Sequence, residues 1–141
     1  GCPIFWSSKL QTETATSTME AEIIALGSCC RELLPIIALV DEIGVAVGIK
    51  KPSDNDSDSS TMHITIHEDN SGALILATTP PPQFTPRSKH YAIKTIWFRE
   101  KIIEKKIKVV PIETRLQLGD IFTKMPPQVT FEFLRNLLQG W

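Results

Sequence analysis

The sequence predicts an α/β layered domain in which strands and helices alternate along the chain. One observation is the apolar pattern of residues 16–44, where hydrophobic side chains recur at steps of three and four, the period of one helix face. Another is the strict alternation of apolar and polar side chains at 62–67, typical of a strand with one face in the core. Shorter runs of both kinds follow, and their order favours helices that flank a sheet.

The first half of the chain predicts a strand, a long helix and a second strand. Three adjacent apolar residues at 4–6 predict a strand over residues 3–11. The hydroxyl side chains at 16–18 can cap the long helix that follows. Pro35 lacks an amide hydrogen, so we expect a kink or a second helix to begin there. The inward side chains of the strand at 62–67 are expected to be Met62, Ile64 and Ile66.

The second half predicts one further strand among several helical segments. Three prolines at 80–82 close the first of these helices, because proline cannot continue a helix. The next helix is expected to bury one face, formed by Tyr91, Thr95, Phe98 and Ile102. In chain order, the segments are a helix at 71–79, a helix at 88–105, a strand at 107–112, a helix start at 118–124 and an amphipathic helix at 131–138.

Length and composition limit the class of protein. The 141 residues suit one domain over 1–141, with the Ser/Asp-rich stretch at about 50–61 as a solvated or disordered acidic loop rather than a linker. A net charge of −1 argues against a polybasic nucleic-acid binder but permits a local basic face. No apolar run reaches the roughly 20 residues of a membrane span, so no membrane partner is expected. Three cysteines without a secretory leader predict an intracellular location.

Three acidic residues are placed where this fold would bring them together. Glu22 lies near the start of the long helix, Asp69 follows the strand at 62–67, and Asp120 begins a later helix. Sites in open α/β sheets form outside the carboxyl ends of strands, and carboxylates held there suit Mg²⁺ or Mn²⁺. Spacing alone leaves simpler roles open for these residues, as a partner of the helix dipole, a turn residue and a helix cap.

Four stretches, FWSSKLQTETATSTMEAEIIAL, HEDNSGALILA, RSKHYAIKTIWFREKI and IETRLQLGDIFTKMPPQVTFEFL, occur in that order. Together they resemble the ribonuclease H domain of copia-type retrotransposon polyproteins, whose pattern runs roughly WSSKKQ, SSTEAEYIAL, DNxSAIxLA, RTKHIDIxxHFIRE and TxxQxADILTKPL. The resemblance covers the chain from about residue 3 to residue 138. It implies a ribonuclease H-like mixed sheet with flanking helices, and metal-dependent hydrolysis of the RNA strand of RNA/DNA hybrids.

The resemblance also assigns roles to individual residues. Glu22, Asp69 and Asp120 match catalytic carboxylates of the family that bind Mg²⁺ or Mn²⁺, with Glu20 as the neighbouring alternative to Glu22. A basic segment matches the RTKH block and its continuation, and it would contact the nucleic-acid backbone; ordinary solvated surface residues are the competing interpretation. The basic residues concerned are Arg87, Lys89, His90, Lys94 and Arg99.

One feature of the family has no match in this sequence. The family carries its first catalytic aspartate on an opening strand, and no Asp or Glu here precedes Glu13. The resemblance therefore predicts an N-terminally truncated domain that lacks the family's first two strands, with weak or impaired activity unless Glu20 or Glu68 replaces the missing ligand. Exposed strand edges at the N-terminus predict one of two outcomes, a homodimer that pairs these edges or a rearranged N-terminal strand that covers them. The alternative is an inactive transposon-derived remnant that binds nucleic acid or is merely structural; either protein would be found in the cytoplasm, the nucleus or a retrotransposon particle.

Overall fold

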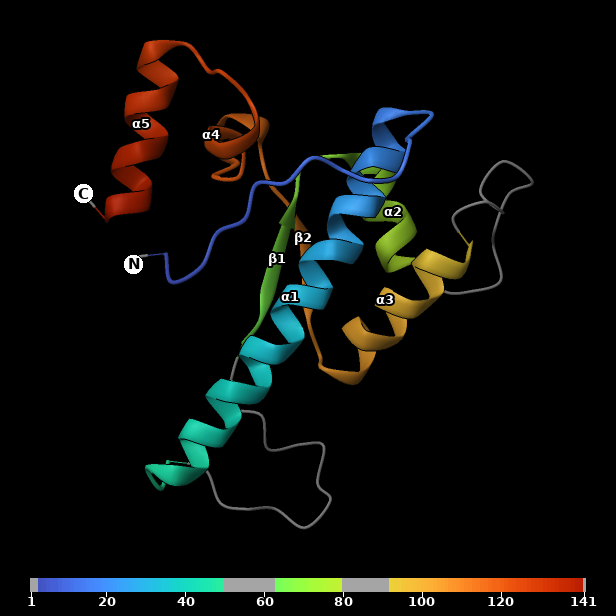
Figure 1. Ribbon diagram of the computed structural model, residues 1–141, viewed down its shortest axis with the longest axis vertical. Helices are drawn as coiled ribbons and strands as arrows, with labels where there is room; N and C mark the ends of the chain where they lie inside the picture. Colours follow the sequence, from blue (N-terminus) through green and yellow to red (C-terminus); the bar gives the residue numbers. More distant parts are fainter. Residues whose placement is uncertain (1–2, 50–62, 80–91, 141) are drawn as a thin grey trace.

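The computed structural model describes residues 3–49, 63–79 and 92–140. Helices dominate this part of the chain, and the two strands form one small sheet (Figure 1). The elements are α1 (Thr18–Ala46), β1 (Thr65–Glu68), α2 (Ser71–Thr78), α3 (Ala92–Glu104), β2 (Lys108–Pro111), a short 3₁₀ helix (Thr114–Leu116), α4 (Asp120–Thr123) and α5 (Gln128–Gln139). The predicted α/β class is confirmed at this level.

Helix α1 begins where its hydroxyl residues predict. The Ser17 side chain accepts a hydrogen bond from the Glu20 amide at 3.1 Å, which satisfies one of the free amides of the first turn. The helix then buries the side chains that recur at steps of three, four and seven, namely Ile23, Leu26, Cys30 and Ile37. It runs through Pro35 without ending, so the expected second helix does not form.

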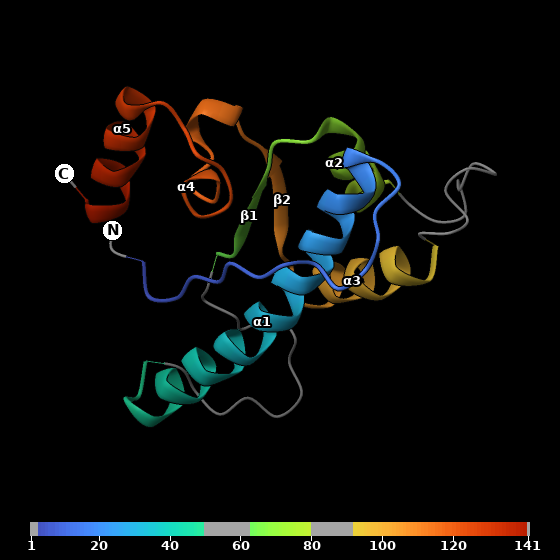
Figure 2. The ribbon, with the colours of Figure 1, turned by 45° about the horizontal axis from the view of Figure 1, so that its top comes forward.

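The 29 residues of α1 are long and apolar enough, by length and composition alone, to cross a membrane. This differs from the expectation that no stretch of the chain is long enough. The core helix of a globular domain meets the same two criteria, and α1 contributes four buried side chains to the core. Its C-terminal half extends away from the other elements in Figures 1 and 2, where Leu39, Ile43 and Val47 are more than half exposed.

The sheet is parallel, as a strand–helix–strand crossover requires. Thr65 of β1 lies opposite Lys108 of β2, and the register continues to Glu68 opposite Pro111. Helices α2 and α3 form the connection between the two strands. The predicted alternation holds in β1, where Ile66 is buried and Thr65 and His67 are exposed. Met62, at the start of the predicted strand, lies outside the described residues.

The core lies between the sheet and the first three helices. Phe98 of α3 is fully buried against the apolar face of α1, and Thr95 and Ile102 lie on the same buried side of α3. The predicted inward face of this helix is therefore confirmed, except for Tyr91, which the structure does not describe. Ala73 and Ala77 allow α2 to pack closely on the same core.

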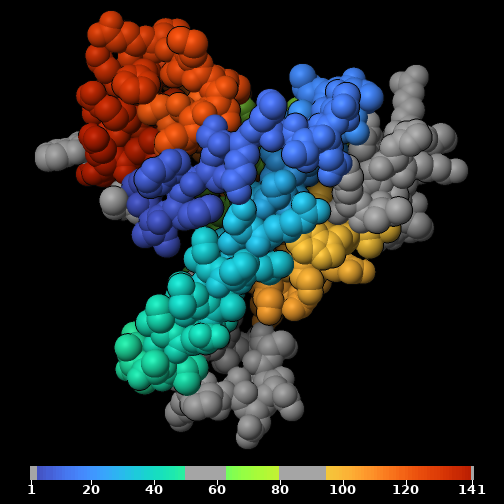
Figure 3. Space-filling view, viewed as in Figure 1, coloured from blue at the N-terminus to red at the C-terminus, as the bar shows by residue number. Residues whose placement is uncertain are grey.

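The predicted N-terminal strand is wrong. Residues 3–11 are not assigned to a strand, and Ile4 and Leu10 of this stretch are 85% and 96% exposed. A strand requires a neighbour to which its amides and carbonyls can bond, and the described part of the chain places none beside it. The stretch crosses between α1 and the C-terminal helices (Figure 3). Trp6 stacks on Phe122 with 6.4 Å between ring centroids.

The C-terminal segment forms a small unit of its own. Helices α4 and α5 contact each other, and Leu134 is buried in α5. In Figures 1 and 2 they lie on the far side of the sheet from α2 and α3. The acidic stretch at about 50–61 lies outside the described residues, so the loop predicted there stays a prediction.

Candidate metal centre

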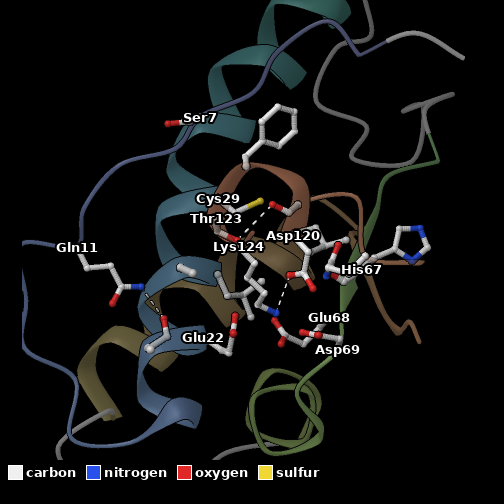
Figure 4. A pocket seen from close by; sticks show the side chains of 17 residues that line it. Ser7, Gln11, Glu22, Cys29, His67, Glu68, Asp69, Asp120, Thr123 and Lys124 are labelled. Atoms are coloured by element: carbon white, nitrogen blue, oxygen red, sulfur yellow. Dashed lines mark hydrogen bonds and ion pairs between the residues drawn. The ribbon is translucent and has the colours of Figure 1, made fainter. Parts of the chain in front are cut away.

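A cleft of about 520 Å³ opens where α1, the carboxyl end of β1 and α4 meet (Figure 4). Its wall includes all three of the acidic residues that the sequence singled out, Glu22, Asp69 and Asp120. The cleft has formed at the carboxyl end of a parallel strand, the position expected for a site in an α/β sheet. The other polar and ionisable side chains in its wall are Ser7, Gln11, Cys29, His67, Glu68, Gln117, Thr123 and Lys124.

Three carboxylates converge within this cleft. One carboxylate oxygen each from Glu22, Glu68 and Asp69 lies within 4.8 Å of the other two. Glu22 extends from the first turns of α1, while Glu68 and Asp69 are the last residue of β1 and the residue after it. Among the described residues, this is the group of His, Cys, Asp and Glu side chains that could hold a metal ion.

The turn after β1 holds the Glu68 carboxylate and anchors the backbone on either side of Asp69. The Asn70 amide donates a hydrogen bond to Glu68 Oε1 at 3.0 Å, and Asn70 Oδ1 accepts one from the Ala73 amide at 3.1 Å. The second bond caps α2, as short polar side chains do at helix starts. Asp69 lies between these two anchored residues, so its backbone is fixed on both sides.

Asp120 lies on the opposite wall, in the first turn of α4. Its Oδ1 forms an ion pair with Lys124 Nζ at 2.8 Å, one helical turn further along the chain. Asp120 is close enough to Glu22 for its charge to raise the pKa of that carboxyl. The hydrogen bond to Asp120, followed by the charges of Asp120, Asp69 and Glu22, raises the pKa of Lys124.

Without a bound metal ion, Lys124 alone does not balance the negative charge of the carboxylates in the cleft. Burial raises the pKa of Glu22, and the negative charge of Asp69 raises it further. Burial likewise raises the pKa of Glu68, which is only 6% exposed, although the hydrogen bond from the Asn70 amide opposes this shift. Burial also raises the pKa of the Cys29 thiol, so this residue is not an activated nucleophile. The carboxylates favour either protons or a cation that neutralises them.

Two residues of the cleft were absent from the set predicted as ligands. The sequence predicts Glu68 only as a replacement for a missing ligand, and Lys124 is not among the predicted residues. Glu68 continues the inward series of Ile64 and Ile66, and Lys124 follows Asp120 at helical spacing, so both signals were present in the sequence. Glu20, the alternative to Glu22, instead accepts hydrogen bonds from the Thr16 amide and hydroxyl at the start of α1.

The predicted basic segment is only partly described. Arg87, Lys89 and His90 lie outside the described residues, and Lys94 lies in the first turn of α3 with its side chain undescribed. Arg99 is 6% exposed, and burial lowers its pKa. Little of this residue is open to solvent, and its predicted contact with nucleic acid stays a prediction.

Three plant transposon proteins are similar in sequence to this chain. The Retrovirus-related Pol polyprotein from transposon TNT 1-94 of Nicotiana tabacum is 28% identical over 138 residues, which is 98% of this chain. Those from transposons RE2 and RE1 of Arabidopsis thaliana are 32% and 31% identical over 130 residues, or 92% of the chain. The homologues of this chain are Pol polyproteins of copia-like transposons.

The similarity spans nearly all of this chain but little of each relative. The chain corresponds to 9% of the tobacco polyprotein and 8% of each Arabidopsis polyprotein. No protein-family model matches the chain, and no solved structure matches it. The comparisons therefore support a retrotransposon-derived domain, and the activity has to be argued from the cleft.

Proposed function

We propose that this chain is a ribonuclease H-like domain of a retrotransposon polyprotein, which binds Mg²⁺ or Mn²⁺ and hydrolyses the RNA strand of RNA/DNA hybrids. The observation that carries the proposal is the convergence of Glu22, Asp69 and Asp120, from three separate elements, in one cleft. These are the residues that match the carboxylates of the family pattern. The homology to Pol polyproteins supports the same conclusion.

The donor set fits a hard divalent cation. Oxygen ligands at 2.0–2.1 Å from Mg²⁺ lie at most about 4.2 Å apart, so oxygens within 4.8 Å of one another need only small side-chain adjustments. Carboxylates are the ligands that Mg²⁺ and Mn²⁺ prefer. Glu22, Glu68 and Asp69 would hold the ion, and Asp120 would complete the site from α4 once its side chain turns from Lys124.

The remaining residues of the cleft would position the nucleic acid. A divalent cation bound there supplies charge neutralisation at the phosphodiester and activation of water. Gln11 of the N-terminal stretch and Gln117 before α4 border the cleft, and their amides can donate to phosphate or 2′-hydroxyl oxygens. Such contacts read the backbone and sugar rather than the base sequence, as hybrid recognition requires.

The alternative is an inactive remnant that binds nucleic acid or is structural only. The observation that favours it is the burial of Arg99, one of the residues predicted to contact the nucleic-acid backbone. In either case we propose that the domain acts in the cytoplasm, the nucleus or a retrotransposon particle.

The deciding experiment is cleavage of a labelled RNA/DNA hybrid in Mg²⁺ and then in Mn²⁺. Wild type is compared with Asp69→Asn and with Asp41→Asn, a matched change in a second cleft on the far half of α1. Product formed by wild type and Asp41→Asn but not by Asp69→Asn supports the ribonuclease. If the Asp69→Asn variant still forms product, the product is not made at this cleft. No product at high enzyme concentration favours the remnant.

We also propose that two copies pair through their N-terminal stretches. Ile4, Trp6 and Leu10 are largely exposed, and the outer edge of β1 pairs with no strand in the described part of the chain. An extended stretch with exposed apolar side chains can add to a strand edge that has no neighbouring strand in the described part of the chain. A monodisperse monomer by light scattering at high concentration would refute the pairing.

A further inference from the structure

The cleft already contains a cation of its own, the ammonium group of Lys124. Its Nζ lies 2.8 Å from Asp120 Oδ1, and Figure 4 shows the side chain directed into the cleft, toward the carboxylates. Among the described residues that line the cleft, Lys124 is the only lysine or arginine, and its ammonium is close enough to Asp120, Asp69 and Glu22 for their charges to act on it. The cleft is therefore lined, in the described part of the chain, by one lysine side chain and four carboxylates.

We propose that Lys124 is a displaceable internal counterion, which neutralises the cleft when no divalent cation is bound and competes with such a cation for Asp120. This inference rests on the proposed metal site and adds a control on its affinity. The ion pair shows that the carboxylates of the cleft stabilise a positive charge placed among them.

The position of Lys124 allows its side chain to move out of the cleft. It is the residue that follows the four-residue helix α4, and the next residue, Met125, is fully exposed. The Lys124 side chain is 55% exposed, whereas that of its partner Asp120 is 16% exposed. A long flexible stem that is open to solvent can swing outward without repacking the core, while Asp120 stays in place.

Displacement has a cost that weakens metal binding. A divalent cation that takes Asp120 as a ligand must break the Lys124–Asp120 ion pair, and the ammonium near the cleft repels it until it moves away. Partly exposed ion pairs contribute up to about 1 kcal/mol, which corresponds to roughly fivefold in an equilibrium constant. Lys124 therefore raises the concentration of cation at which the site is half occupied.

The test is Mn²⁺ binding to the full chain, measured from the electron paramagnetic resonance signal of free Mn²⁺, with no nucleic acid present. Lys124→Met and Lys124→Gln remove the charge, and Lys124→Arg keeps it. Lys101→Met is the matched control, because Lys101 pairs with Glu104 on α3 and lies outside the cleft. Circular dichroism verifies that each variant is folded.

The inference predicts about fivefold tighter Mn²⁺ binding for both uncharged variants, and binding within twofold of wild type for Lys124→Arg and Lys101→Met. If wild type binds Mn²⁺ but the uncharged variants bind it equally or more weakly, the counterion role is refuted and the metal site stands. If neither wild type nor any variant binds Mn²⁺, the metal site and the counterion role both fail.

Discussion

Replacing Gly27 with alanine should stabilise the fold, because it removes a flexible residue from the middle of α1. Gly27 lies inside the 29-residue helix, on the side that faces α3. A Cβ atom added there would have Phe98 Cδ1 as its nearest neighbour at 3.9 Å, an ordinary van der Waals contact. The added methyl group therefore fits without displacing the core that holds Glu22 at the cleft.

The expected gain follows from helix propensity and from the contact. Alanine is about 0.8–1 kcal/mol more favourable than glycine in a helix interior, and the new contact adds a small further gain. For a domain of this size, about 1 kcal/mol raises the melting temperature by roughly 3–4 °C. Urea denaturation followed by circular dichroism measures the change directly, and the m-value shows whether the unfolded state has changed.

The same substitution at Gly48 provides the matched control. Gly48 follows α1 with a φ of +73°, a left-handed conformation that costs an L-residue about 1 kcal/mol. Gly48→Ala should therefore destabilise the protein by about that amount, although nothing lies within 4 Å of its new Cβ. If Gly27→Ala also destabilises the protein, α1 and α3 pack more tightly than the 3.9 Å contact indicates, and the reasoning is wrong.

Three further predictions concern the cleft and the core. Asn70→Ala removes the side-chain cap of α2 and should lower the free energy of unfolding, measured by urea denaturation, by about 1 kcal/mol. An unchanged free energy of unfolding would mean that the hydrogen bond from the Ala73 amide does not stabilise the fold. Phe98→Ala leaves a cavity at a fully buried position and should lower the free energy of unfolding by about 3–5 kcal/mol in the same assay. A loss below about 0.5 kcal/mol would mean that Phe98 is exposed in solution. Glu22→Gln should stabilise the cation-free protein at pH 7 by up to about 1 kcal/mol, because the folded state raises the pKa of this carboxyl. That gain should vanish below pH 4.5, where the carboxyl is protonated in both states, and a gain that persists there would exclude a charge effect.

The features that could be predicted are those that depend only on the residues of one helix or strand, such as its hydrophobic period or its capping residue. The period of three to four residues predicted the buried face of α1, and the same period on α3 predicted Thr95, Phe98 and Ile102 as its inward side chains. Ser17, one of the three hydroxyl residues predicted to cap α1, does so because short polar side chains accept from amides two or three residues ahead. Each of these properties depends on residues only a few positions apart.

Two outcomes that the local sequence left open or predicted wrongly depended on packing between distant segments. Proline in a helix interior costs about 3 kcal/mol, yet α1 continues past Pro35 because Ile37, two residues later, is buried in the core. Burial of further apolar side chains beyond a proline can offset the lost hydrogen bond, and local sequence does not reveal how much is buried. The strand expected at 3–11 failed for a similar reason, because a strand depends on a neighbour that its own residues do not specify.

The acidic residues that line the candidate site could be predicted from the sequence, but the charge balance of the cleft could not. Asp69 and Asp120 are at element boundaries that the sequence defines, and the geometry of a parallel sheet brings such boundaries together. Glu68 is different, since its burial places a carboxylate beside two others and raises its pKa. A buried carboxylate cluster persists in a fold only when hydrogen bonds and positive charge compensate for lost solvation. The Asn70 amide provides the first kind of compensation and Lys124 provides part of the second, which leaves an excess of negative charge that a divalent cation would neutralise.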